Sequence, residues 1–314
     1  MPRSRQLTSQ LGRVRALLTT LVAALAAAGG AGSAAAGDDL AYKQQYCDSG
    51  YADACFALGY AYHQGEGVSV DLTLAAQYYR KACEGRDGRG CGNLALLYET
   101  GAGVPREPKT ARDLYKTACS RGEVEACSNL GAMYAEGKGL EVDLAQALIL
   151  YKRACDQGGA SGCANLGRLY ELGRGTGVDL ELASELYDKG CEGGEMVACN
   201  HLGLMYEEGR GIELDHYEAA RLYLRASNAG YAPATANLGR MYYWGWSVRR
   251  NRPRAATLYE SACEARVAEA CHSLSQLYRK GEGVTADEAR AAVLDARACE
   301  LGRTESCPKE EPTP

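Results

Sequence analysis

The sequence predicts an all-α fold, a right-handed α/α superhelical solenoid of 36-residue helical hairpins. Three observations support this fold class. Cysteines recur in pairs eight residues apart, and the first cysteines of these pairs are separated by multiples of 36 residues. The residue types between them recur without insertion or deletion over residues 47–298. We call each 36-residue stretch that begins at the position of such a first cysteine a frame. In every frame a leucine and a tyrosine four residues apart mark one face of a helix.

The N-terminal segment, residues 1–36, is predicted to be a signal peptide. Four arginines form a basic region, Ala16 to Ala28 form an apolar stretch, and Ala34-Ala35-Ala36 form a cleavage site of small residues. The alternative is an uncleaved anchor, which needs about 20 apolar residues, but the stretch is rich in glycine and alanine. We therefore expect no stable membrane insertion after cleavage.

Charge excludes one class of partner. Removal of residues 1–36 takes away four arginines and no acidic residue, so the formal charge changes from −5 to −9. Nucleic acid is bound by a basic face that releases counterions from the phosphate backbone. We therefore expect no nucleic-acid partner.

Each frame predicts a first helix that follows the second cysteine. In the third frame Leu130 and Tyr134 lie four residues apart and therefore on one helical face. Gly137 follows three residues later, and a glycine readily adopts the left-handed conformation that ends a helix. The same three residue types recur at 36-residue intervals in all seven frames. The first helix of every frame is thus predicted to end at a glycine.

A second helix is predicted between an acidic N-cap and the first cysteine of the next frame. Asp143 and Asp215 are placed to accept hydrogen bonds from the free amides of the first turn. Gln146 and Glu218 follow three residues later and predict a reciprocal capping box. Small residues recur in both helices and allow neighbouring helices to approach closely, as in a solenoid.

The cysteines are predicted to pair at a separation of eight residues. Positions 227 and 235, where a further pair would fall, hold Ser227 and Thr235. This double loss leaves seven complete pairs, whereas a scheme that linked Cys55 to Cys83, and so on, would orphan four cysteines. Regular disulfides need an oxidising compartment, so we expect a periplasmic or secreted protein. The predicted bridges are Cys47–Cys55, Cys83–Cys91, Cys119–Cys127, Cys155–Cys163, Cys191–Cys199, Cys263–Cys271 and Cys299–Cys307.

The repeat array is predicted to span residues 38–307. It comprises seven hairpins and a C-terminal cap helix that Cys299 and Cys307 pin, about fifteen helices in all. Residues 308–314 are predicted to be a disordered tail, because proline and charge leave nothing to pack. We expect the protein to be a monomer.

These patterns resemble the Sel-1-like repeat, a relative of the tetratricopeptide hairpin. The resemblance covers essentially the whole chain after the signal peptide. Within this family, the chain resembles in particular the bacterial secreted cysteine-rich subgroup. It implies a scaffold that binds a protein, a peptide or a cell-envelope glycan. Some cysteine-rich members are penicillin-binding proteins or weak β-lactamases, so a β-lactam hydrolase is the alternative. The motif elements are Asn129-Leu130-Gly131-Ala132-Met133-Tyr134, Gly137-Lys138-Gly139 and Leu150-Tyr151-Lys152-Arg153-Ala154-Cys155.

The sequence predicts no catalytic residue, no cofactor and no metal site. A serine β-lactamase needs Ser-Asp-Asn and Lys-Thr-Gly elements. The nearest fragments, Lys109-Thr110-Ala111 and Lys116-Thr117-Ala118, lack the glycine. The four histidines occupy different positions in different frames and form no metal-ligand pattern. The hydrolase alternative therefore depends on the family resemblance alone.

The sixth frame, which begins at Ser227, is the candidate partner-binding segment. It lacks the cysteine pair, contains the only two tryptophans and is locally rich in arginine. These residue types anchor interfaces, and arginine pairs with carboxylates through two hydrogen bonds, so we expect an acidic or carboxylate-bearing partner. Alternatively, the aromatic residues fill space and acids of adjacent repeats balance the arginines. The candidate residues are Tyr231, Arg240, Tyr243, Trp244, Trp246, Arg249, Arg250 and Arg252.

Overall fold

The computed structural model describes residues 39–307, and its regular elements are all helical. The predicted all-α array of hairpins is confirmed within this range, while the predicted signal peptide and the predicted tail lie outside it. Residues 39–48 form a helix that precedes the fourteen helices named below, and the short turn η1 (Thr304–Ser306) follows them. The helices are α2 (Ala52–Gln64), α3 (Leu72–Glu84), α4 (Gly88–Thr100), α5 (Pro108–Ser120), α6 (Val124–Glu136), α7 (Leu144–Asp156), α8 (Ala160–Leu172), α9 (Leu180–Glu192), α10 (Met196–Glu208), α11 (His216–Asn228), α12 (Ala232–Trp244), α13 (Arg252–Glu264), α14 (Ala268–Lys280) and α15 (Glu288–Glu300).

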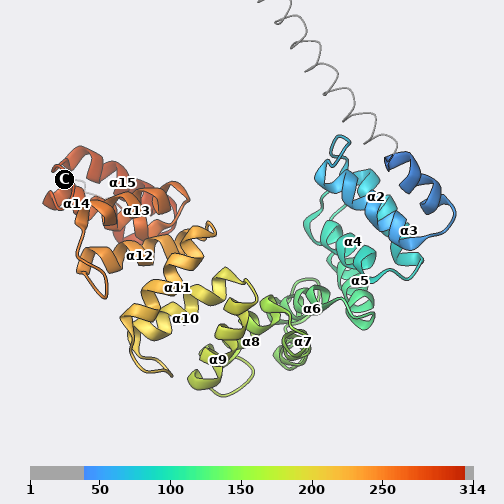
Figure 1. Cartoon of the computed structure of the whole chain (residues 1–314), viewed down its shortest axis with the longest axis horizontal. Coiled ribbons are helices and arrows are strands. Elements are labelled where there is room, and N and C mark those ends of the chain that lie inside the picture. Colours follow the sequence, from blue (N-terminus) through green and yellow to red (C-terminus); the bar gives the residue numbers. More distant parts are fainter. Residues whose placement is uncertain (1–38, 308–314) are drawn as a thin grey trace, which may run out of the picture. The chain divides into compact units, whose positions relative to one another are not determined.

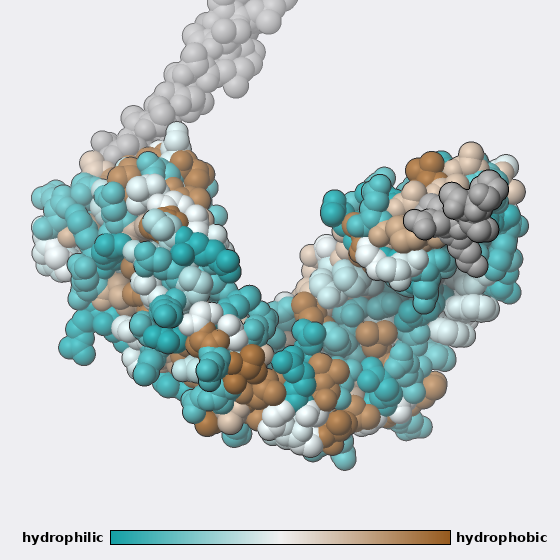
Figure 2. Space-filling view, turned by 180° about the vertical axis from the view of Figure 1, so that it is seen from behind, coloured by the Kyte–Doolittle hydropathy of each residue, from teal (hydrophilic) through white to brown (hydrophobic). Residues whose placement is uncertain are grey.

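The chain folds as two compact units. The first comprises the residues up to Ala126 with Lys138–Leu140, and the second comprises Cys127–Gly137 with the residues from Glu141 onward. In the second unit α8 to α15 follow one another as antiparallel pairs in chain order (Figure 1). On the face shown in Figure 2, apolar residues lie in small groups among hydrophilic ones. Within residues 39–307, every helix is too short or too polar to span a bilayer.

Two glycines shape the loop between the helices of a pair. Gly209 ends α10 with φ 65°, and its N–H donates to the carbonyl of Met205. Gly211 also has a positive φ, and a Cβ there would lie 2.4 Å from the carbonyl carbon of Leu180 in the preceding pair. The first glycine is needed for the turn and the second for the close approach of two backbones.

In five of the helix pairs the core places a tyrosine of the second helix against a glycine of the first. Tyr79 and Tyr223 are fully buried. A Cβ on Gly59 would lie 2.5 Å from the ring of Tyr79, and one on Gly203 would lie 2.7 Å from the ring of Tyr223. The recurrent glycine therefore makes room for the aromatic ring, and the prediction of close packing by small residues is confirmed.

Aspartate caps α3, α7, α9, α11 and α15 as predicted, but the reciprocal capping box is wrong. The side chain of Asp143 accepts from the N–H of Gln146 at 2.9 Å, and Asp215 caps α11 in the same way. The main-chain N–H of Asp143, however, donates to the carbonyl of Tyr134 at 2.9 Å. This bond closes the loop onto the first helix and uses the donor that Gln146 would need.

The predicted cysteine pairing is confirmed by six bridges within residues 39–307. Their Cα–Cα distances lie between 4.5 and 4.8 Å, and Cys119 and Cys127 are disulfide-bonded as well. Cys191 near the end of α9, for example, bonds Cys199 in the first turn of α10 across Gly194, which has φ 93°. The bridge thus closes the turn that leads from one helix pair to the next.

A hydrogen bond replaces the disulfide between α11 and α12. The hydroxyl oxygens of Ser227 and Thr235 lie 2.8 Å apart. Gly230 between them has φ 86°, as the glycines of the bridged turns do. The backbone of this turn therefore follows the others, and only the covalent link is absent.

Replacing Ser227 and Thr235 together by cysteine should add a bridge at this turn. A closed loop of this length should stabilise the oxidised protein by about 2.5 kcal/mol, because it restricts the unfolded chain. Chemical denaturation of the oxidised double variant and the wild type measures the gain. The matched control, Ser227→Ala with Thr235→Ala, removes the hydrogen bond without adding a bridge. A fully oxidised cysteine variant no more stable than the wild type would contradict the expectation.

Candidate functional site

The candidate residues lie along α12 and the loop that connects it to α13. Arg240, Tyr243 and Trp244 belong to the last two turns of α12, and Trp246 to Arg250 lie in the loop. Arg252 is the first residue of α13, whereas Tyr231 immediately precedes α12 at its opposite end. The structure therefore brings together all the candidates except Tyr231.

Arg240 is neutralised within the protein. Its guanidinium donates to both carboxylate oxygens of Glu207 on α10, at 2.9 and 2.8 Å. The hydroxyl of Tyr223 donates to the same carboxylate at 2.7 Å, and only 7% of the Glu207 side chain is exposed. Burial opposes the charge of Arg240, but the Glu207 carboxylate outweighs it and raises the pKa of the guanidinium. Arg240 is thus already paired with an acid of the same chain and is not free to bind a partner.

Arg252 and Tyr243 are also engaged, through Glu282 in the loop after α14. The hydroxyl of Tyr243 donates to Glu282 Oε2 at 2.6 Å, and Arg252 pairs with Glu282 Oε1 at 3.3 Å. The hydrogen bond to Glu282 raises the pKa of Tyr243. Acids of adjacent repeats therefore balance Arg240 and Arg252.

The remaining arginines of the segment are free to pair with a carboxylate of a partner. Arg249, Arg250 and Arg254 are exposed, and none pairs with a carboxylate of residues 39–307. Arg250 donates from Nε to the carbonyl of Tyr243 at 3.1 Å, which orients its guanidinium. The loop also borders an open cavity of about 810 Å³, lined by Tyr242, Val248, Arg249, Arg250, Asn251, Arg252 and Pro253.

The two tryptophans have different environments. Trp246 stacks on His216 with a centroid separation of 5.1 Å and packs against the buried core. Ser247, with φ 56°, replaces the glycine that approaches the preceding pair in other repeats, so the aromatic stack takes the place of that contact. Trp244 is 52% exposed and its ring lies 6.0 Å from that of Trp246. Trp246 therefore holds the loop in place, and Trp244 is accessible to a partner.

A smaller cavity, the α12–α14 pocket, lies between the first helices of two adjacent pairs. Its volume is about 260 Å³. The pocket residues from α14 were not predicted from the sequence, although positions one frame apart, such as 240 and 276, both line the pocket. Aligning the frames and comparing equal positions could have found them. The lining residues are Arg240, Tyr243, Trp244, Tyr259, His272, Ser273, Gln276, Leu277, Lys280 and Glu282.

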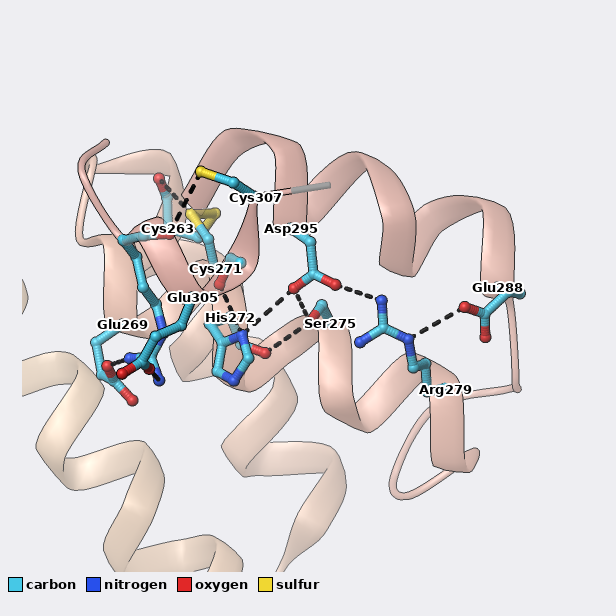
Figure 3. A network of polar contacts seen from close by, with 12 residues as sticks. Cys263, Glu269, Cys271, His272, Ser275, Arg279, Glu288, Asp295, Glu305 and Cys307 are labelled. Carbon is cyan, nitrogen blue, oxygen red and sulfur yellow. Dashed lines mark hydrogen bonds and ion pairs between the residues drawn. A yellow bond between two sulfur atoms is a disulfide. The ribbon is translucent and has the colours of Figure 1, made fainter. Parts of the chain in front are cut away.

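A polar network next to this pocket contains a serine, a histidine and an aspartate (Figure 3). His272 Nδ1 lies 2.9 Å from Ser306 Oγ and 3.4 Å from Asp295 Oδ1, and Ser275 donates to Asp295 at 2.6 Å. A catalytic histidine contacts the acid with one ring nitrogen and the nucleophile with the other. Here both contacts involve the same nitrogen, so the network is a structural one. The described residues also contain no cluster of metal-ligating side chains.

Glu171 on α8 occupies the position equivalent to Glu207, one repeat earlier. Its carboxylate lies 3.5 Å from His201 Nδ1, accepts from Tyr187 at 2.6 Å and pairs with Arg210 at 3.0 Å. The hydrogen bond from His201, followed by those from Tyr187 and Arg210, outweighs burial and lowers the pKa of Glu171 to about 2. The network thus stabilises the ionised form of a largely buried acid.

Glu171→Gln should therefore destabilise the protein in a pH-dependent manner. Because the folded pKa is below the ordinary value of 4.5, the ionised group stabilises the fold above that pH. We expect a loss of up to about 3 kcal/mol at neutral pH. The difference from wild type should shrink as the pH falls from 4.5 to about 2. Unfolding free energies measured across this range test it, with exposed Glu213→Gln, which forms no ion pair within residues 39–307, as the control. A difference that is independent of pH would contradict it.

Together these features define an all-helical tandem-repeat scaffold with cavities along one pair of adjacent repeats. The chain belongs to the Sel1 repeat family. The Sel1 repeat model matches residues 52–87, 89–123, 124–159, 160–195, 197–231, 232–266 and 268–302. Because each matched repeat begins with the first helix of a pair, a disulfide links each bridged repeat to its neighbour.

Solved structures support this assignment. The chain is 32% identical, with a TM-score of 0.70, to a protective antigen of uropathogenic Escherichia coli strains that displays an SLR fold. That match covers 85% of this chain, which spans only 57% of the antigen. A Sel1 repeat protein from Oxalobacter formigenes is 29% identical with a TM-score of 0.63, and the match covers 68% of this chain and 85% of that one. The search of curated proteins found no match.

Proposed function

We propose that this chain is an exported Sel1 repeat scaffold that binds an acidic segment of a partner protein. The binding surface, here called the arginine surface, consists of Trp244, Arg249, Arg250 and Arg254. The observation that carries the proposal is the presence of three exposed guanidinium groups without a carboxylate partner in residues 39–307, on the loop and first turn that follow the half-exposed indole at the end of α12. Exposed arginine and tryptophan are typical of interface anchors. One copy of the chain carries the whole surface, so a monomer suffices.

Three further points support the proposal. Sel1 repeat proteins generally bind proteins, which favours a protein partner over a cell-envelope glycan. The disulfides indicate an oxidising, non-cytoplasmic compartment, which fits a periplasmic or secreted scaffold. The arginine surface is positive within a chain of net charge −5, so it selects the acidic region of a partner.

Peptide binding tests the proposal. A fluorescein-labelled peptide rich in glutamate should bind the oxidised protein, and its glutamine counterpart should not. Arg249→Ala with Arg250→Ala and Arg254→Ala should weaken glutamate-peptide binding by about tenfold or more, because three charge-assisted contacts are lost. The control, Lys116→Ala with Arg168→Ala, removes exposed cations elsewhere and should bind normally.

Four outcomes would overturn the proposal. Equal binding of the glutamate and glutamine peptides would exclude recognition of charge, and equal binding by the triple variant would exclude the arginine surface. Preferential binding of an acidic oligosaccharide such as oligogalacturonate would assign the surface to a glycan. Turnover of nitrocefin by the purified oxidised protein, without peptide binding, would favour the hydrolase instead.

A further inference from the structure

We infer that the α12–α14 pocket holds an aromatic side chain of the partner, so that the segment recognised is an acidic peptide with an aromatic anchor. This inference rests on the proposed function and adds a second subsite to it. The arginine surface attracts the carboxylates of the peptide, and the pocket selects an aromatic residue that lies between them.

The size and lining of the pocket fit a single aromatic side chain. Its volume of about 260 Å³ is below the range of roughly 300–1,000 Å³ that is usual for sites of drug-sized ligands. Trp244, Tyr259 and Leu277 provide aromatic and apolar walls. An aromatic ring between such walls buries a large apolar area and gains favourable edge-to-face or offset contacts. His272 and Gln276 add polar groups that would tolerate a tyrosine hydroxyl.

The free charge at the pocket is positive. Arg240 and Glu282 both line it, but each is already paired within the protein. Lys280 also lines it, is exposed and forms no ion pair with residues 39–307. The Glu282 carboxylate acts on this ammonium group but also on Arg250 and Arg252, so these three cations outnumber it and would attract an acidic residue beside the aromatic anchor. The pocket therefore favours the same acidic character in the partner as the arginine surface does.

The pocket and the arginine surface are joined by the last turn of α12. Trp244 belongs to both, since it lines the pocket and lies beside the loop. Tyr243 lines the pocket, and its carbonyl accepts the Arg250 hydrogen bond at 3.1 Å. Successive residues of an extended peptide are about 3.3–3.6 Å apart. A peptide with its aromatic residue in the pocket can thus place nearby carboxylates on the guanidinium groups.

Three five-residue peptides test the inference: Glu-Glu-Phe-Glu-Glu, Glu-Glu-Ala-Glu-Glu and Gln-Gln-Phe-Gln-Gln. The first should bind at least tenfold more tightly than either of the others. Trp246→Phe retains an aromatic ring on His216 and leaves Trp244 as the single tryptophan. In this variant the fluorescence of Trp244 should change on addition of the phenylalanine peptide and change far less with the alanine peptide.

A variant that fills the pocket provides the structural control. Ser273→Phe should abolish the preference for the phenylalanine peptide and leave binding of the alanine peptide unchanged. Asn165→Phe, at the equivalent position three repeats earlier, should preserve the preference. If the phenylalanine and alanine peptides bind equally well, the pocket assignment fails and the proposed function stands. If neither acidic peptide binds, both fail.

Discussion

Full reduction of the disulfides should unfold the protein at ambient temperature. Each closed loop restricts the unfolded chain by about 2.5 kcal/mol, and whole domains are stable by only about 5–15 kcal/mol. The loss of even half of the bridges therefore matches the entire stability of a typical domain. Circular dichroism melting curves recorded with and without a strong reductant, followed by alkylation to count the released thiols, measure the effect.

The position of the bridges explains why the effect should be large. In a repeat array each unit is stabilised mainly through its interface with the next. The bridge between Cys191 and Cys199 joins α9 to α10, which belong to consecutive matched repeats. Reduction therefore weakens the interfaces on which the array depends. A melting curve that is unchanged although alkylation shows every thiol released would contradict this account.

The repeat period was sufficient to predict the fold and the cysteine pairing. Both follow from relations within one frame: a leucine and a tyrosine on one helical face, a glycine at the helix end, and the joint absence of cysteine at Ser227 and Thr235. The structure confirms these because, within each compact unit, neighbouring repeats pack on one another in the same register. Residue spacing was therefore enough to predict contacts between residues that lie close together in the sequence.

The candidate site was predicted less completely, because its contacts cross frames. Arg240 was expected to be available for a partner, but Glu207, 33 residues earlier, binds it. The position of Glu207 is held by Tyr243 in the next frame and by Arg279 in the one after it. The side chain at this position therefore changes from repeat to repeat, whereas the backbone conformation stays the same. Spacing alone therefore could not show which arginines are paired.

Arg240→Ala should destabilise the protein by about 3 kcal/mol. The substitution leaves the Glu207 carboxylate, whose side chain is 7% exposed, without its cation. The hydroxyl of Tyr223 still donates to it but supplies no countercharge. Chemical denaturation measures the loss. Arg250→Ala is the matched control, because Arg250 is exposed and bonds only a carbonyl, so its removal should change the stability by less than about 0.5 kcal/mol.

A double variant separates the loss of the ion pair from the loss of packing. Arg240→Ala combined with Glu207→Gln removes the stranded charge, so it should be more stable than Arg240→Ala alone. If the double variant is instead destabilised by the sum of the two single changes, Arg240 contributes through its packing and the pair is not coupled. If Arg240→Ala costs no more than Arg250→Ala, Glu207 does not depend on Arg240.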